Sequence, residues 1–366
     1  MHPLSGSNIH TLVRVLIENG GVSRAAWPQA ALALAATLGR WPFTAAEDLY
    51  VRRRLRRAGA LPPPIFIVGH WRSGTTHLYN MMSKAGFGFV EPLAAGMPWD
   101  LLGLVKLARP LLERKLPRDR FIDSIPVTPD SPQEDEVAIA NMTRLSFYHA
   151  LYFPRSFEKL FNRGVFLDGC SESDVREWKD AFVYFLHKVW LQQGRRQLLI
   201  KNPVYTARVA MLQEIFPGAR FIHVYRNPYE VLQSMQNFYE KLLRQFALQD
   251  YDALPINRVI VETYSRMMSK LVEETDSLPD NVFIEVRYER LEENPLAEIE
   301  RIYKAFDLDG FAEARTAIAA YLASIRSYKK NRYAYSEENL VLVEREWAYF
   351  LDRWQYRRPG ADDALA

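Results

Sequence analysis

Residues 64–78 read Pro64-Ile65-Phe66-Ile67-Val68-Gly69-His70-Trp71-Arg72-Ser73-Gly74-Thr75-Thr76-His77-Leu78. The four apolar residues Ile65 to Val68 predict a buried strand. Two glycines, Gly69 and Gly74, bound the loop that follows, and a segment with helical spacing begins directly after the second glycine. A strand, a glycine-bounded loop and a helix in this order direct backbone N–H groups at a phosphate. The stretch therefore predicts a phosphate-binding loop on an α/β fold.

The loop differs from the P-loop of nucleoside triphosphatases at one position. The P-loop pattern GxxxxGK[ST] places a Lys after its second glycine, and that Lys reaches the β- and γ-phosphates. Here Gly69 and Gly74 keep the spacing, but Thr75 occupies the position of the Lys, and the loop's cation is Arg72. The loop therefore suits a nucleotide with fewer phosphates than ATP.

The bulk composition is that of an ordinary globular protein. The chain has 366 residues, of which 48% are hydrophobic, and its net charge of +3 is too small to indicate nucleic-acid binding. The single cysteine, Cys170, excludes an internal disulfide and agrees with a reducing compartment. The nearest candidate for a membrane span, Ala30 to Leu38, is far too short. We expect a cytoplasmic protein that can also associate with a membrane surface.

The chain is predicted to divide near residue 60. Residues 1–60 have helical spacing and form an N-terminal helical annex, which ends in the basic cluster Arg52-Arg53-Arg54-Leu55-Arg56-Arg57. This cluster either contacts anionic lipid headgroups or forms a solvated helix face. Three prolines then lead into residues 61–366, which we predict to be one α/β domain. Within it, the long, mostly helical stretch before the second strand is where we expect acceptor recognition.

Three further strands are predicted, at residues 198–200, 221–225 and 282–286. Helical patterns separate them, so the sheet should be mainly parallel and flanked by helices, as in P-loop proteins. Two of the strands lead into similar sequences, Lys201-Asn202-Pro203 and Arg226-Asn227-Pro228. In each, Asn is predicted to cap a helix, and Glu230 completes a capping box with Asn227. Both cations would then lie at the carboxyl ends of parallel strands, where open α/β sheets bind ligands.

Arg226 and Ser234 form a second candidate site. Arg226 ends a predicted strand, and Ser234 follows eight residues later, two turns into the next helix. At this spacing a guanidinium and a hydroxyl can reach the same phosphate.

The Arg72–Thr76 core and the Arg226–Ser234 pair together resemble sulfotransferases that use 3′-phosphoadenosine 5′-phosphosulfate (PAPS), in the branch that includes bacterial and tyrosylprotein enzymes. The resemblance implies the following roles. The 5′-phosphate is held by Ser73, Gly74, Thr75 and Thr76. Arg72 and Lys201 neutralise the sulfuryl group and the leaving oxygen, and Arg226 and Ser234 hold the 3′-phosphate. Tyr288 would pack near the nucleotide. Lys330, in the basic run 328–333, either closes over the 3′-phosphate or belongs to a solvated turn. A glycine-rich signature of the cytosolic branch is absent.

The catalytic base has several candidates. Some members of the family use a Glu roughly twenty residues after the phosphate loop, and Glu91 follows Arg72 by nineteen. Its neighbours predict a junction between a strand and a loop, where partial burial would make it a stronger base. Glu134 and Glu136 are alternatives, although the pattern from Ser131 also reads as a capped helix start. His70, beside the loop, is another. No metal-ligand spacing is present.

The sequence therefore predicts a sulfotransferase. It would move the sulfuryl group of PAPS to the hydroxyl of a lipid, carbohydrate or other small molecule and release 3′-phosphoadenosine 5′-phosphate (PAP). Apolar stretches at residues 95–125 and 235–250 favour a lipid-like or aromatic acceptor. The alternatives are a small-molecule kinase that uses ATP, against which the missing P-loop Lys argues, and a catalytically silent nucleotide-binding scaffold. Peripheral membrane contact is compatible with each.

Overall fold

The structure is a computed structural model that describes residues 2–116, 127–251, 254–325 and 335–360. Its contacts divide the chain into two compact units. The first comprises Met1–Pro63, Gly88–Ile200 and Lys241–Leu254, and the second comprises Pro64–Phe87, Lys201–Glu240 and Pro255–Ala366. The division of the sequence near residue 60 into an annex and a single domain stays a prediction.

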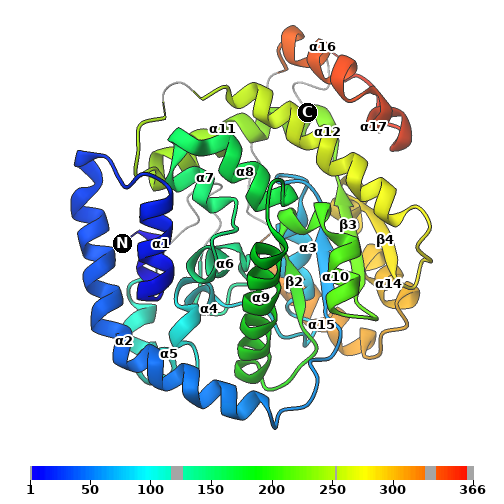
Figure 1. The fold of residues 1–366 in the computed structure, drawn as a ribbon. Helices are drawn as coiled ribbons and strands as arrows, with labels where there is room; N and C mark the ends of the chain where they lie inside the picture. Colours follow the sequence, from blue (N-terminus) through cyan, green and yellow to red (C-terminus); the bar gives the residue numbers. More distant parts are fainter. Residues whose placement is uncertain (1, 117–126, 252–253, 326–334, 361–366) are drawn as a thin grey trace. The chain divides into compact units, whose positions relative to one another are not determined.

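Helices make up the first unit (Figure 1). In chain order they are η1 (Pro3–Gly6), α1 (Ile9–Glu18), η2 (Arg24–Ala26), α2 (Trp27–Leu55), α4 (Pro92–Gly96), η3 (Pro98–Asp100), α5 (Leu104–Glu113), α6 (Glu136–Met142), α7 (Tyr148–Tyr152), η4 (Pro154–Ser156), α8 (Phe157–Phe166) and α9 (Glu172–Gln192). The predicted helical character of residues 1–60 is confirmed. Pro42 lies inside α2 and cannot donate the backbone hydrogen bond to the preceding turn, and Figure 1 shows that the helix bends along its length.

The second unit holds the glycine-bounded loop, most of the sheet and its covering helices. Its elements are β1 (Ile65–Val68), α3 (Thr75–Met82), η5 (Pro203–Ala207), α10 (Val209–Ile215), β3 (Arg220–Tyr225), α11 (Pro228–Phe246, whose end belongs to the first unit), α12 (Ile256–Thr275), β4 (Phe283–Arg287), α13 (Tyr288–Glu293), α14 (Pro295–Ala305), α15 (Phe311–Ser324), α16 (Glu337–Glu346) and α17 (Ala348–Arg353). The strand β2 (Leu199–Lys201) spans the boundary between the units.

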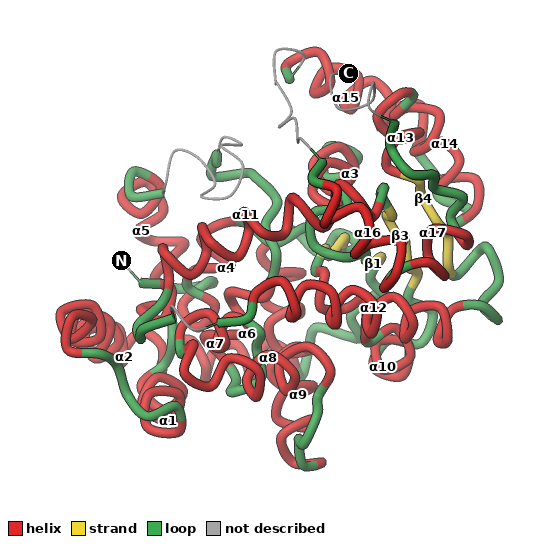
Figure 2. The backbone as a smooth tube through the Cα atoms, turned by 90° about the horizontal axis from the view of Figure 1, so that it is seen from above, coloured by secondary structure: helices red, strands yellow, loops and turns green. Residues whose placement is uncertain are grey.

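The sheet has the order β2-β1-β3-β4. β1 pairs with β3 in parallel, with Phe66 opposite Phe221, and β3 pairs with β4 in parallel, with His223 opposite Glu285. Figure 2 shows the strands as a layer with α3, α14 and α15 on one side and α10 and α12 on the other. The four predicted strands and the helix after the glycine loop are thus confirmed. All residues of β1 are fully buried, as the unbroken apolar run required.

Candidate functional site

The loop after β1 leaves the sheet through a backbone position that only glycine can fill. Gly69 has a φ of +141°, and a Cβ there would lie 2.3 Å from the carbonyl oxygen of Val224 in β3. The Gly69 N–H donates to the hydroxyl of Thr206 at 2.7 Å. Thr206 was not predicted as part of the site, because a hydrogen bond across 137 residues leaves no local signal.

The loop itself has the form of an anion cradle. Arg72 and Gly74 both adopt left-handed backbone conformations, with φ of 68° and 97°, and a bulky residue such as Arg adopts this only when its surroundings enforce it. Ser73 is buried, and its hydroxyl has no hydrogen-bond partner among the described residues. α3 begins at Thr75, so its first N–H groups have no partner within the helix. An orphaned hydroxyl beside a helix N-terminus fits a bound phosphate.

The cation of the loop is joined to the second predicted phosphate site. The Nε of Arg72 donates to the hydroxyl of Ser234 in α11 at 2.8 Å. Ser234 is buried, and the two residues are 162 positions apart in the chain. The two motifs that the sequence identified separately therefore meet in one place.

Arg226 is attached to the same loop through Tyr288. Its guanidinium carbon lies 4.6 Å from the centre of the Tyr288 ring, and the guanidinium forms an ion pair with Glu230. A Cβ on Gly74 would lie 2.0 Å from that ring, so glycine lets the tyrosine pack directly against the loop. Burial would lower the pKa of Arg226, but Glu230, together with Tyr288 and Glu289, offsets this and the pKa lies above its usual value. The Nε of Arg226 is buried and has no hydrogen-bond partner among the described residues.

Lys201 completes the cluster of cations. It is the last residue of β2 and is only 2% exposed. Its ammonium donates to the hydroxyl of Thr76 in the first turn of α3 at 3.2 Å. A buried ammonium is costly unless polar groups surround it, so this lysine is not a solvated strand end.

Two predicted capping boxes are wrong. Glu230 does not reach back to Asn227; it pairs with Arg226, and the Asn227 N–H donates to Glu289 instead, at 3.0 Å. A charged guanidinium binds a carboxylate more strongly than a backbone N–H does. The other prediction placed a helix start at Ser131, but α6 begins only at Glu136, and Ser131 accepts a hydrogen bond from the Thr128 N–H.

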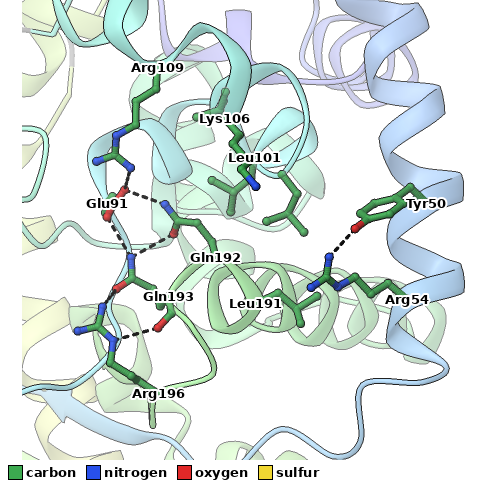
Figure 3. Close-up of a pocket in the computed structure, with 12 residues that line it drawn as sticks. Tyr50, Arg54, Glu91, Leu101, Lys106, Arg109, Leu191, Gln192, Gln193 and Arg196 are labelled. Atoms are coloured by element: carbon green, nitrogen blue, oxygen red, sulfur yellow. Dashed lines mark hydrogen bonds and ion pairs between the residues drawn. The ribbon is translucent and has the colours of Figure 1, made fainter.

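Glu91 lies in the first unit, where it is the residue before α4 rather than the end of a strand. Its carboxylate is buried and accepts hydrogen bonds from Arg109 at 2.9 Å, from Gln192 at 2.7 Å and from Gln193 at 3.0 Å (Figure 3). These donors were not predicted, because α5 and the end of α9 meet Glu91 only through tertiary packing.

Glu91 also lines a cavity of about 400 Å³ within the first unit. Figure 3 shows leucines from α9 and from the residues before α5 on one part of its wall and several cations on the rest. The lining residues are Tyr50, Arg54, Glu91, Leu101, Leu102, Val105, Lys106, Arg109, Leu191, Gln192, Gln193 and Arg196. A wall of this mixed kind suits an amphiphilic ligand.

The other candidate bases have different surroundings. Glu136 is buried and accepts hydrogen bonds from the Ser146 hydroxyl at 2.7 Å and the Phe147 N–H at 3.1 Å, which ties it to the start of α7. Glu134 precedes α6 and is partly exposed. Burial lowers the pKa of His70 to about 4, so its imidazole is neutral at pH 7 and a weak base. Lys330 lies outside the described residues.

Together these contacts place three cations, those of Arg72, Lys201 and Arg226, around the glycine-bounded loop and the first turn of α3 in an α/β fold. Comparison with known proteins gives the family. Residues 63–313 match the model of the sulfotransferase family. Two relatives are each named omega-hydroxy-beta-dihydromenaquinone-9 sulfotransferase Stf3, from Mycobacterium bovis and Mycobacterium tuberculosis. Each is 30% identical to this chain over 369 residues, which cover 98% of this chain and 92% of the relative.

Two solved structures share the fold. Sulfotransferase STF9 from Mycobacterium avium has a TM-score of 0.67 at 15% identity and covers 97% of this chain and 98% of its own. Sulfotransferase STF1 from Mycobacterium tuberculosis has a TM-score of 0.62 at 15% identity, with 92% and 90% covered. This chain belongs to the sulfotransferase family. It is a transferase that moves a sulfuryl group from a sulfate donor to an acceptor hydroxyl, so the kinase and scaffold alternatives are set aside.

Proposed function

We propose that the donor is PAPS and that the cluster around Arg72 binds it. The observation that carries this proposal is the hydrogen bond between Arg72 and Ser234, because it joins a loop suited to a 5′-phosphate to a motif suited to a 3′-phosphate. The orphaned atoms of Ser73 and Arg226 support it, since each is a buried polar group that a phosphate oxygen would satisfy.

Each residue of the cluster then has a role. Ser73 and the N–H groups from Gly74 to Thr76 hold the 5′-phosphate, and Arg226 with Ser234 holds the 3′-phosphate. PAPS supplies the sulfuryl group, and PAP is the product that leaves. Arg72 and Lys201 are fixed by their contacts to Ser234 and Thr76, so they stabilise charge on the transferred group and leaving oxygen without reorganising. Tyr288 packs beside the nucleotide.

We propose Glu91 as the base that accepts the proton of the acceptor hydroxyl. Its position nineteen residues after Arg72 and its place on the wall of the cavity support this role. Both oxygens already accept hydrogen bonds, so the acceptor hydroxyl would take the place of one of the glutamine donors.

The acceptor is proposed to be lipid-like. The mycobacterial relatives are named for a dihydromenaquinone, a lipid with a terminal hydroxyl, and the leucines of the cavity suit an apolar chain. A substrate of this kind is met at a bilayer, so we also propose peripheral contact with a membrane.

Calorimetric titration with PAP, adenosine 5′-phosphate and ATP tests the donor. We expect PAP to bind at least tenfold more tightly than adenosine 5′-phosphate, because the 3′-phosphate adds charged hydrogen bonds. This preference should disappear in Arg226→Ala and persist in Arg315→Ala, an exposed residue of α15 in the same unit. Equal affinity for PAP and adenosine 5′-phosphate in the unmodified protein would refute the assignment.

A further inference from the structure

The long helix α2 turns its apolar residues outward. Between Ala30 and Tyr50, a stretch described without gaps, every exposed residue is Ala, Leu, Gly, Trp, Pro, Phe or Tyr. The helix of a water-soluble domain normally shows the opposite arrangement, with charged residues facing solvent. Here the polar residues of that stretch, the threonines, Arg40, Glu47 and Asp48, are buried or half-buried.

Five of the large exposed residues form one stripe, and Leu32, Phe43 and Tyr50 are exposed beside it. Trp27, Leu34, Leu38, Trp41 and Leu49 are spaced by seven, four, three and eight residues, which keeps them on one face of a helix. Trp27 is 63% exposed, Leu38 is 54% exposed and Trp41 is 59% exposed. A single exposed leucine is ordinary in a protein surface, but a contiguous apolar face of this length marks an interaction site.

Polar contacts on the inner side hold α2 in this orientation. Arg40 forms an ion pair with Asp100, which also accepts a hydrogen bond from Thr44 at 2.6 Å. Glu47 forms an ion pair with the buried Lys188 at 2.7 Å and accepts hydrogen bonds from the N–H groups of the two residues before α5. Rotating the helix to bury its leucines would leave these buried charges without their partners, which is strongly unfavourable. The apolar face therefore stays on the outside.

The neighbouring helix α5 extends the same kind of surface. Because Glu47 binds the N–H groups of Leu102 and Gly103, α5 starts beside α2. Leu107 of α5 is 80% exposed and Leu111 is 58% exposed. We call the exposed apolar residues of α2 and α5 the apolar face.

Positive charge lies at the ends of this face. The exposed arginines Arg52, Arg53, Arg54, Arg56 and Arg57 lie at the C-terminal end of α2 and just beyond it. Lys106, Arg114 and Lys115 are exposed on α5 and directly after it. Such a combination of tryptophans, leucines and a basic cluster is typical of helices that lie in the headgroup region of an anionic bilayer. Within the described ranges, no helix combines the length and the apolar character that crossing a bilayer requires.

We propose that the apolar face lies flat on an anionic phospholipid bilayer, with the leucines and tryptophans among the acyl chains and the basic cluster against lipid phosphates. This proposal rests on the proposed function in one respect. A lipid-like acceptor would lie in the bilayer, and the apolar face is the surface through which the protein would reach it.

Flotation of the full chain with vesicles tests the proposal. We expect binding to vesicles of phosphatidylcholine with about 30% phosphatidylglycerol, and weak binding to phosphatidylcholine alone. The variant Leu38→Gln/Trp41→Gln should bind at least about tenfold more weakly, because it removes two large apolar side chains from the stripe. The matched variant Val341→Gln/Tyr349→Gln changes two exposed apolar residues of α16 and α17 and should bind normally.

A second pair of variants isolates the charge. Arg53→Gln/Arg56→Gln/Arg57→Gln should lose most of the preference for anionic vesicles, whereas Arg315→Gln/Arg345→Gln/Arg357→Gln, elsewhere on the surface, should retain it. Vesicles with brominated lipids should quench the fluorescence of the unmodified protein, and Trp27→Phe/Trp41→Phe should remove most of that quenching. Circular dichroism confirms that each variant is folded.

Two outcomes would overturn the proposal. One is the absence of vesicle binding by the unmodified protein. The other is a stable dimer in analytical ultracentrifugation that Leu38→Gln/Trp41→Gln dissociates, since the apolar face would then be covered by a second copy of the chain. Titration with PAP tests the donor independently of the membrane surface. Normal PAP binding without vesicle binding refutes only the docking surface. Vesicle binding without PAP binding refutes only the proposed donor.

Discussion

The Nε of Arg72 donates a hydrogen bond to the hydroxyl of Ser234 at 2.8 Å, although the two residues belong to different motifs 162 positions apart. Arg72 has a left-handed backbone conformation, with a φ of 68°. Ser234 fixes the end of the Arg72 side chain. The serine therefore has two tasks in our proposal, to bind the 3′-phosphate and to hold the arginine that faces the sulfuryl group.

Ser234→Ala tests this double role. The variant removes a hydrogen bond to a charged group, so we expect the affinity for PAP to fall by about tenfold to a hundredfold. The turnover number should fall as well, because Arg72 loses its anchor. Calorimetry and steady-state kinetics measure the two effects. Ser324→Ala, in which an exposed serine of α15 loses a hydrogen bond to the Tyr321 carbonyl, is the control. Unchanged kinetics in Ser234→Ala would show that the hydrogen bond is incidental.

Gly74→Ala should be destabilising for two separable reasons. The φ of 97° disfavours any side chain, and the new Cβ would lie 2.0 Å from the Tyr288 ring. Gly86 also has a positive φ, of 85°, but nothing lies within 4 Å of a Cβ there. Gly86→Ala should therefore cost about 1–3 kcal/mol of unfolding free energy from backbone strain alone, and Gly74→Ala should cost more.

Denaturant unfolding measures both glycine variants. A second change, Tyr288→Ala, removes the ring that blocks the new methyl group. We expect Gly74→Ala/Tyr288→Ala to be less destabilised than the sum of its two single changes, since the clash is then relieved. Strict additivity would mean that the tyrosine does not pack against the loop.

Most residues of the proposed donor site were predicted from the sequence because their signals are local. A strand followed by glycines and a helix start is readable within fifteen residues, and so is a cation at the ends of two further strands. These features gave Arg72, Lys201 and Arg226 their positions at one edge of a parallel sheet. The partners Thr206 and Glu289 left no such signal, because each bond joins segments that are distant in the chain.

The orientation of α2 shows where such prediction stops. The sequence correctly indicated that residues 1–60 are helical, but it did not indicate which side of the helix is buried. In the structure Val51 is buried while Ala45 and Leu49 are exposed. Helical spacing gives the period of a pattern but not which side of the helix faces the core. In α2 that side is set by Asp100 and Lys188, which form ion pairs with polar residues of the helix.

Lys201→Met should lower the turnover number by about a hundredfold or more, because our proposal assigns this buried charge to the transferred group and the leaving oxygen. Methionine preserves the length and packing of the side chain, which is only 2% exposed. The Michaelis constant for the donor should change much less. Lys304→Met, at an exposed position of α14, should leave both constants unchanged. A loss confined to the Michaelis constant would show that Lys201 only binds the donor.

Glu91→Gln distinguishes a base from a structural carboxylate. If Glu91 accepts the proton, the variant should lose about a hundredfold or more in turnover. Arg109→Gln removes the ion pair at 2.9 Å but keeps the carboxylate, so it should lose much less. Equal losses in the two variants would mean that Glu91 only holds the wall of the cavity.

His70 should make the stability of the fold depend on pH. Its Nδ1 lies 2.9 Å from the Trp71 carbonyl, which can only accept, so Nδ1 carries the proton of the neutral ring. Burial lowers the pKa from 6.5 to about 4 in the folded state. The unfolded chain therefore binds this proton at a higher pH than the folded chain does. The stabilisation is complete above about pH 6.5 and is lost as the pH falls toward about pH 4.

His70→Gln isolates that effect from the other histidines. Between about pH 7.5 and about pH 5, the unmodified protein should lose about 2 kcal/mol more unfolding free energy than His70→Gln does. Urea unfolding at several pH values measures the difference. His187→Gln, at a half-buried histidine of α9, is the control and should follow the unmodified protein. Parallel curves for the unmodified protein and His70→Gln would mean that His70 takes up its proton in the folded state as readily as in the unfolded chain.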